Sequence, residues 1–261
     1  MSLKTRLTSR YRSLHWKLYN ATSGFLLGRM KLSYQLPSGI TVAVSSFADW
    51  AIYNDVFVAG EYDVPIRQAL QSGDGPVRIL DLGANVGLFL KRVLHLRRTE
   101  FPTVPVELIC VEGAPSTFSL LQRQTPELQP GESVQLLHGL AGQRSGEALL
   151  ATSPFHAMTG LARHPNAAGV AVKFLDLSEA TKAWPRINLL KCDIEGAEQM
   201  VLENDCDLMR KVELSVFEFH LFQVNRELCL SLCKTAGLIH RIVHHENEHI
   251  SVETLGRHTP N

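Results

Sequence analysis

The chain has 261 residues, in which 26 Lys and Arg balance 26 Asp and Glu and 45% of residues are hydrophobic. This length suits one α/β domain with additions, and the balanced charge gives no overall field that would attract nucleic acid. The five cysteines are odd in number and form no C-x-x-C pair, which favours a reducing, cytoplasmic location. No stretch reaches the roughly 18 apolar residues of a membrane span, and the N-terminus lacks the apolar core of a signal peptide.

The first 48 residues stand apart in charge, because they hold seven Lys or Arg and no Asp or Glu. Their apolar residues recur at spacings of four and three, which predicts one stripe of a basic amphipathic α-helix. Such a helix can dock on the protein itself, mediate self-association, lie on an anionic membrane or serve as a transit peptide. We expect docking, because five apolar residues give only modest membrane affinity. The stripe consists of Leu3, Leu7, Tyr11, Leu14 and Leu18.

After residue 74 the sequence repeats an apolar run, a turn with Gly or Asp, and a segment of helical spacing. This alternation predicts βαβ units around a parallel sheet. We therefore divide the chain into a helix and cap segment over 1–74 and a doubly wound α/β domain over 75–261. The less regular stretch 143–185 is expected to cross over the top of the sheet, above a ligand. Predicted strands are 77–82, 106–112, 133–138, 187–192 and 212–220, followed by a helix over about 225–236 and an antiparallel pair, 238–244 and 249–255.

The turn after the first predicted strand reads DLGANVGLF and lies where doubly wound sheets bind their ligands. Gly83, Asn85 and Gly87 form a G-x-N-x-G turn, which lets backbone approach a ligand and directs helix N–H groups at an anion. A dinucleotide fingerprint would require G-x-G-x-x-G and an acid about 20 residues further on. Leu88 occupies the last of those glycine positions and Glu112 lies farther along the chain, so the turn does not match that fingerprint.

Asp81 precedes this turn, at a position where a dehydrogenase usually has an apolar residue. A carboxylate there suits an ammonium group and repels a pyrophosphate. S-adenosyl-methionine carries an ammonium for Asp81, a carboxylate for the helix N-terminus and a ribose diol for Glu112. The alternative is that Asp81 only caps the turn and that Glu112 pairs with a basic surface residue. Because Asp81, the glycine turn and Glu112 occur together, we favour the cofactor interpretation.

The stretch LLKCDIEGAE ends the fourth predicted strand with charged residues. Alternation places Lys191 and Asp193 on one side of the strand as it leaves the sheet, where Lys191 either acts in the site or only pairs with Asp193. Methyl transfer to a hydroxyl requires in-line approach and loss of a proton, and Asp193 can attract a sulfonium or act as the base. We expect Glu195 to contact the substrate. Glu195 and Glu198 should fall in the first turn of the next helix, with Glu198 as a helix-start residue.

The fifth predicted strand ends FEFH, which places Glu218 and His220 on one face, beside Asp193. His220 can act as a general base. Alternatively, Asp193, Glu218 and His220 offer oxygen and nitrogen ligands for a divalent cation, as in the catechol-type O-methyltransferases. A third interpretation is a strand-end pair that orients a substrate loop. The three residues lack tight local spacing, so a metal is possible but not favoured.

Several separate stretches, from about Leu36 to Leu255, resemble the FkbM-type S-adenosyl-methionine-dependent methyltransferases. The resemblance implies a seven-stranded class I methyltransferase (Rossmann-like) sheet with a terminal antiparallel hairpin. It also implies O-methylation of a small molecule, a sugar, or a glycan or lipid-linked acceptor. Gly113 replaces a commoner Pro of that family, and His138-Gly139 stands where the family often has Asn-Ala. The stretches are LPSGITV, FVAGEYD, DLGANVGLF, VEGAP, HGLAGQRSG and, as the most specific, LLKCDIEGAE.

The resemblance and the turn chemistry together define the expected site. The alternative to an enzyme is a non-catalytic protein that binds the cofactor or acts as a membrane-associated scaffold. Methylation of a nucleobase nitrogen is disfavoured, because the fourth strand lacks an Asn/Asp-Pro-Pro-aromatic loop and the catalytic portion shows no basic, aromatic-rich patch. Expected catalytic residues are Asp193, Glu195, His220 and Lys191; expected cofactor contacts are Glu61, Asp81, Gly83, Ala84, Asn85, Gly87, Glu112, Gly113, His138, Gly139, Leu140 and Asp193.

Overall fold

The computed structural model describes residues 32–72, 75–151 and 169–258. The predicted N-terminal amphipathic helix lies outside these ranges, so its docking, its membrane contact and its role in self-association stay predictions. Within the described ranges, no helix has both the length and the apolar character needed to cross a bilayer.

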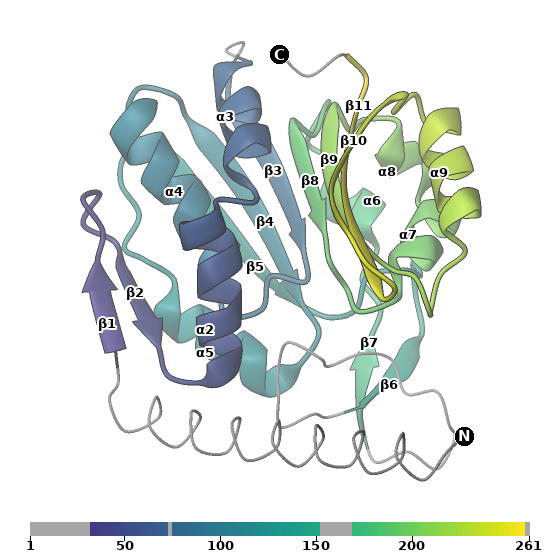
Figure 1. The fold of residues 1–261 in the computed structure, drawn as a ribbon, viewed down its shortest axis with the longest axis horizontal. Helices are drawn as coiled ribbons and strands as arrows, with labels where there is room; N and C mark the ends of the chain where they lie inside the picture. Colours follow the sequence, from purple (N-terminus) through teal and green to yellow (C-terminus); the bar gives the residue numbers. More distant parts are fainter. Residues whose placement is uncertain (1–31, 73–74, 152–168, 259–261) are drawn as a thin grey trace, which may run out of the picture.

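Seven strands form one sheet with helices on both faces (Figure 1). In sheet order they are β10 (His240–Glu246), β11 (Ile250–Gly256), β9 (Leu214–His220), β8 (Leu189–Cys192), β3 (Val77–Leu82), β4 (Val106–Glu112) and β5 (Glu132–His138). The strands from β9 to β5 run parallel, whereas β11 pairs antiparallel with both β9 and β10. The predicted doubly wound α/β fold with a terminal antiparallel hairpin is therefore confirmed.

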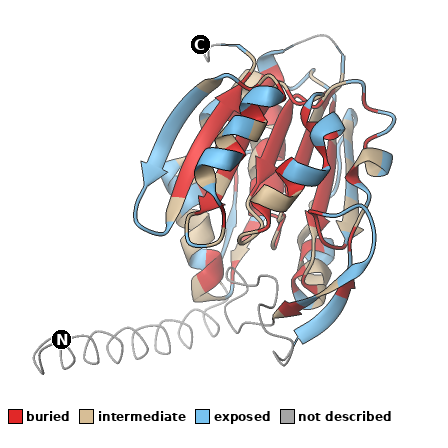
Figure 2. Ribbon diagram, turned by 90° about the vertical axis from the view of Figure 1, so that its right-hand side faces the viewer, coloured by how far each residue is buried: buried red, intermediate tan, exposed pale blue. Residues whose placement is uncertain are grey.

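Alternate side chains of the central strands enter two separate cores, so these strands are buried on both faces (Figure 2). Ile79 of β3 packs with residues of α3 and α4, whereas its neighbour Leu80 packs with residues of α7 and α9. This alternation explains why the central strands read as continuous apolar runs. One face is covered by α3 (Asp63–Gln71), α4 (Leu88–Glu100) and α5 (Pro115–Gln124), and the other by α6 (Leu177–Ala180), α7 (Glu198–Asn204), α8 (Cys206–Met209) and α9 (Arg226–Thr235).

The described part of the cap segment packs on the α3 and α4 side of the sheet. It contains β1 (Leu32–Gln35), β2 (Thr41–Val44), α2 (Phe47–Tyr53) and η1 (Asn54–Ala59), a π-helical continuation of α2. Val42, Val56 and Ile66 share a core with Ile79 of β3. Tyr62 packs edge-on against Phe89 of α4, with ring centroids 5.2 Å apart. The cap is thus held against the edge of the sheet at which the parallel strands end.

Residues 143–185 contain a separate antiparallel pair, β6 (Glu147–Ala151) and β7 (Gly169–Lys173). Several strand boundaries differ from prediction; in particular, β8 begins at Leu189 and β9 at Leu214. Ile187 and Val212, which were predicted to begin these strands, form an isolated bridge with each other instead.

Candidate active site

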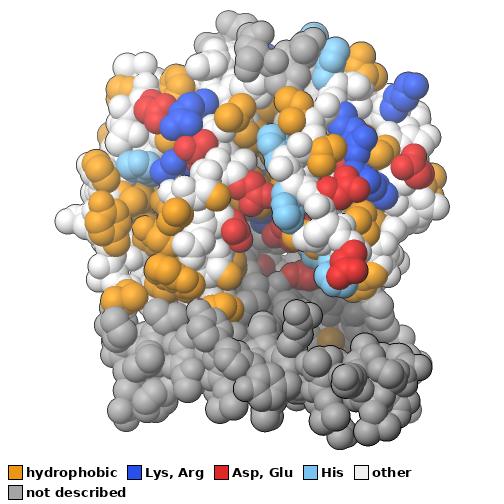
Figure 3. Space-filling view, in the orientation of Figure 1, with side chains coloured by type: hydrophobic (Ala, Val, Ile, Leu, Met, Phe, Trp, Pro, Cys, Tyr) orange, Lys and Arg blue, Asp and Glu red, His pale blue; other side chains and the backbone are white. Residues whose placement is uncertain are grey.

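A cavity lies at the carboxyl ends of β3, β4 and β8, where a doubly wound sheet binds its ligands. The β3–α4 turn, the end of β4, the end of β8 and the cap all contribute to its wall. In the face drawn in Figure 3, acidic side chains gather near the middle of the molecule. The cavity therefore combines an approachable backbone turn with a surplus of carboxylates. Of the predicted site residues, Glu61, Gly83, Ala84, Asn85, Glu112, Gly113, Gly139, Leu140, Lys191, Asp193 and Glu195 line it.

The β3–α4 turn contains three residues in the left-handed region, Gly83 at φ 79°, Asn85 at φ 51° and Gly87 at φ 85°. The backbone N–H groups of Asn85 and Ala114 donate to the two carboxylate oxygens of Glu112, at 2.9 and 2.8 Å. Glu112 thereby ties the turn to the end of β4, and burial raises the pKa of this carboxyl despite both bonds. A Cβ at Gly83 would lie 1.8 Å from the carbonyl oxygen of Asp193, so only glycine fits this approach of β8.

Lys191 connects the glycine turn with two carboxylates. Its Nζ donates to the carbonyl oxygen of Gly83 at 2.7 Å and lies 3.4 Å from Asp81 Oδ1 and 3.7 Å from Asp193 Oδ2. Burial alone would lower the pKa of Lys191, but Asp81 and Asp193 outweigh it and raise that pKa, so the ammonium stays charged. Asp81 is fully buried and does not line the cavity. Asp81 is thus the partner of Lys191, and its direct contact with a cofactor stays a prediction.

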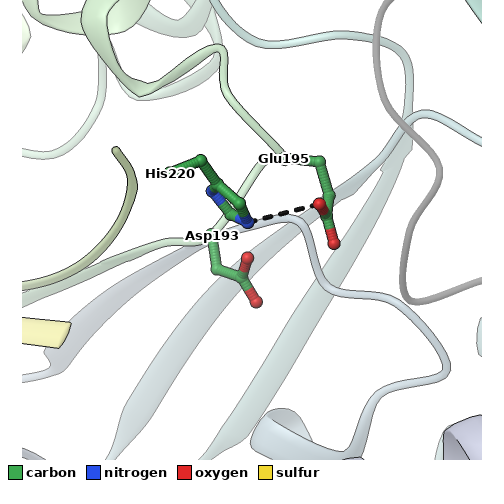
Figure 4. A group of neighbouring side chains, drawn as sticks. All are labelled: Asp193, Glu195 and His220. Atoms are coloured by element: carbon green, nitrogen blue, oxygen red, sulfur yellow. Dashed lines mark ion pairs between the residues drawn. The ribbon is translucent and has the colours of Figure 1, made fainter. Parts of the chain in front are cut away.

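His220 lies between carboxylates, with its Nδ1 3.0 Å from Glu198 Oε1 and its Nε2 3.2 Å from Glu195 Oε2 (Figure 4). Burial would lower the pKa of this imidazole, but the hydrogen bonds to the two glutamates raise it to about 11. An imidazolium donates from both nitrogens and has no lone pair to accept a proton. In this arrangement His220 contacts two carboxylates, and its role as a general base stays a prediction.

Glu195 does not fall in the first turn of the following helix, which corrects the prediction. Its φ is 54° and that of Gly196 is 95°, so the chain makes a left-handed turn and α7 begins only at Glu198. Burial raises the pKa of Glu195, although the hydrogen bond to His220 acts in the opposite direction. This turn leaves Glu195 lining the cavity, beside Asp193.

The structure brings together Asp193, Glu195 and His220 as a possible cation site, since each offers one ligand atom within 4.8 Å of the others. Glu195 here takes the place predicted for Glu218, whose Oε1 is 3.9 Å from His220 Nε2. A cation could reach the imidazole only if His220 gave up a contact to a glutamate. A divalent metal therefore remains an unfavoured prediction.

Two further acids at the cavity have unusual proton affinities. Burial, together with Asp55 and Asp193, raises the pKa of Glu61 to about 7. Asp193 and burial raise the pKa of Glu218 to about 9, so at neutral pH this carboxyl is protonated and can donate a hydrogen bond. Asp55 lines the same cavity from η1 and was missed in the sequence, because no local pattern relates that part of the cap to the strand ends.

Gly87 and His138, both predicted cofactor contacts, support the cavity wall instead of lining it. Gly87 is the N-cap of α4, and a Cβ there would lie 2.8 Å from Leu121 of α5. His138 Nε2 lies 3.1 Å from the carbonyl oxygen of Gly113, and its ring centroid is 5.0 Å from that of Phe118.

Comparison with known proteins gives one curated relative with similar sequence, although no protein-family model matches the chain. The chain is 25% identical over 163 residues to the hexuronic acid methyltransferase AglP of Haloferax volcanii. The match covers 62% of this chain and 63% of that protein, so the chain spans somewhat less than two thirds of its relative's length.

Solved structures with a similar fold include the methyltransferase FkbM from Methylobacillus flagellatus, at 13% identity and a TM-score of 0.49, covering 91% of this chain and 59% of that one. MNMC2 from Aquifex aeolicus, at 13% identity and a TM-score of 0.45, covers 87% and 70%. Identities this low indicate likeness of fold alone. The curated relative is a methyltransferase, in agreement with the sequence motifs that resemble the FkbM-type methyltransferases.

Proposed function

We propose that the protein is an S-adenosyl-methionine-dependent methyltransferase that methylates a hydroxyl of a sugar, either free or within a glycan or lipid-linked acceptor. One observation carries the proposal: the glycine turn, Glu112 and the carboxylates at the end of β8 line the same cavity. Cofactor recognition and proton removal can therefore take place side by side.

The residues of this cavity fit S-adenosyl-methionine. Glu112 offers a fixed carboxylate to a ribose diol, since two backbone N–H groups hold it in place. Gly83 and Ala84 present backbone and little side chain to the methionine end. A surplus of carboxylates attracts a sulfonium and repels a diphosphate, which argues against a dinucleotide in this position.

The bound cofactor supplies an activated methyl group on a positively charged sulfur. Held by Glu112 and the glycine turn, the cofactor would present its methyl group to the end of β8, where Asp193 would accept the proton of the acceptor hydroxyl. Lys191 stays protonated and fixes Asp193 against the glycine turn. Glu218, neutral at pH 7, can donate a hydrogen bond to another acceptor oxygen. Most of the rate acceleration comes from this positioning.

The sugar acceptor is proposed by analogy with the curated relative, which is named for a hexuronic acid. To test this, purified protein is incubated with methyl-labelled cofactor and neutral sugars, uronic acids or glycans, and the products are treated with mild base. An O-methyl ether keeps its label, whereas a methyl ester on a carboxyl group loses it. Stable label on a sugar supports the proposal. Binding of S-adenosyl-homocysteine without any label transfer would indicate a non-catalytic cofactor-binding protein, and label on an amine would indicate N-methylation.

A further inference from the structure

The turn between β8 and α7 is held from inside by one carboxylate oxygen. Glu198 Oε1 accepts from the backbone N–H groups of Ile194, at 3.2 Å, and Gly196, at 3.0 Å. The same oxygen lies 3.0 Å from His220 Nδ1 at the end of β9. Glu198 itself is fully buried. It therefore does more than begin a helix, because it joins the turn that carries Glu195 to the imidazole that Glu195 contacts.

Glu195 occupies a backbone conformation that a glutamate adopts only with support. Among the described residues, Asn85 and Glu195 are the two non-glycine residues with positive φ. Asparagine tolerates the left-handed region, but in glutamate that region brings Cβ too close to the following carbonyl oxygen. At the adjacent Gly196, whose φ is 95°, a Cβ would lie 2.7 Å from Gln223 Cβ, so a side chain there would displace Gln223. The turn that Glu198 binds thus places the Glu195 side chain at the cavity.

We infer that Glu198 and His220 form a buried positioning pair that aims the Glu195 carboxylate at the acceptor hydroxyl. His220 Nε2 holds Glu195 Oε2, which leaves Oε1 for the acceptor. Figure 4 shows the carboxylates of Asp193 and Glu195 next to the imidazole. Asp193 removes the proton, and Glu195 orients the hydroxyl. This inference rests on the proposed function and adds Glu198 as a positioning residue that touches neither cofactor nor acceptor.

The test is a double-substitution cycle on acceptor kinetics. Glu198→Ala, Glu195→Ala and the double variant are assayed below their unfolding temperatures for acceptor kcat and KM. If Glu198 acts through Glu195, Glu198→Ala lowers acceptor kcat/KM about ten- to hundredfold in the unsubstituted protein. In the Glu195→Ala background, Glu198→Ala lowers acceptor kcat/KM by less than about twofold, because the contact of Glu195 with the acceptor is already lost. The dissociation constant of S-adenosyl-homocysteine, measured by calorimetry, changes by less than about twofold in every variant if the cofactor side is untouched.

Conservative variants separate positioning from folding. Glu198→Gln keeps an acceptor oxygen for the turn and for His220, so it should restore most of the activity that Glu198→Ala loses. His220→Gln places an amide N–H near the position of Nε2 and can still hold Glu195, whereas His220→Asn reaches only Glu198. We expect the Gln variant to keep the higher acceptor kcat/KM. Glu203→Ala, an exposed glutamate on the same helix α7, is the matched control and should change nothing.

Equal losses from Glu198→Ala in both backgrounds, or a parallel loss of S-adenosyl-homocysteine affinity, would make Glu198 a structural residue and overturn the inference. If Glu198→Ala does not fold, the Gln and Asn variants of His220 decide instead, and equal activity in both counts against positioning. Absence of label transfer by the unsubstituted protein overturns the proposed function together with this inference. Failure of the inference alone leaves that transfer intact.

Discussion

The contact between Gly83 and the carbonyl of Asp193 predicts a large effect of Gly83→Ala. A Cβ at Gly83 would lie 1.8 Å from Asp193 O, whereas ordinary contact begins at 3.4 Å. The β3–α4 turn and the end of β8 would therefore have to separate by about 1.6 Å, the difference between these two distances. That movement would stretch the bond from Asp193 N to Leu82 O, now 3.1 Å, and displace both walls of the cavity.

Two contributions set the magnitude of this effect. Alanine at φ 79° costs about 1–2 kcal/mol, because the left-handed region brings Cβ too close to the carbonyl oxygen. Relief of the clash adds about 1–3 kcal/mol, the usual range for overpacking. The free energy of unfolding should fall by about 2–5 kcal/mol, which lowers the melting temperature by about 5–15 °C for a chain of this size.

The matched control is Gly39→Ala. Gly39 has a φ of 83°, but a Cβ there would meet no atom within 4 Å, so only the conformational cost of about 1–2 kcal/mol applies. Thermal unfolding and calorimetry with S-adenosyl-homocysteine measure both variants. We expect Gly83→Ala to lose more stability than Gly39→Ala and to bind at least about tenfold more weakly, because a shift of this size misplaces the cavity wall. Equal stability and unchanged binding in the two variants would refute the reasoning.

Four other predictions follow from the site. Asp193→Asn should keep the melting temperature and lower turnover at least about tenfold, as expected for a lost general base, and full activity would remove Asp193 from the mechanism. Glu112→Ala should weaken S-adenosyl-homocysteine binding by about 1–3 kcal/mol in calorimetry, and undiminished affinity would argue against a ribose contact. Asp193 and burial raise the pKa of Glu218 from its ordinary value of 4.5 to about 9, so the native state binds more protons than the unfolded state between these values. Glu218→Gln should therefore gain stability relative to the unsubstituted protein as pH rises from about 5 to 9, and melting curves that keep a constant difference would contradict this. EDTA should leave turnover unchanged, because carboxylates already hold both nitrogens of His220; loss of activity that Mg²⁺ restores would instead establish the metal interpretation.

The local sequence pattern determined the strands and the ligand-binding turn of this protein. The predicted ranges 77–82 and 106–112 match β3 and β4, because continuous apolar runs bounded by turn residues have few other conformations available. The G-x-N-x-G turn was equally readable, since Gly83 and Asn85 are residues that tolerate the left-handed region. The parallel sheet and its terminal antiparallel pair followed from the alternation of these short segments.

Only the tertiary structure decided the charges and partners of the site. Sequence alternation brought Lys191 and Asp193 to one side of a strand but did not reveal that Asp81 is the buried partner of Lys191. Likewise, nothing near His220 in the chain indicated that Glu195 and Glu198 would keep it protonated. Backbone conformation depends on neighbours in sequence, whereas burial and Coulomb interaction depend on distances in space, and packing of the strands and the cap sets those distances.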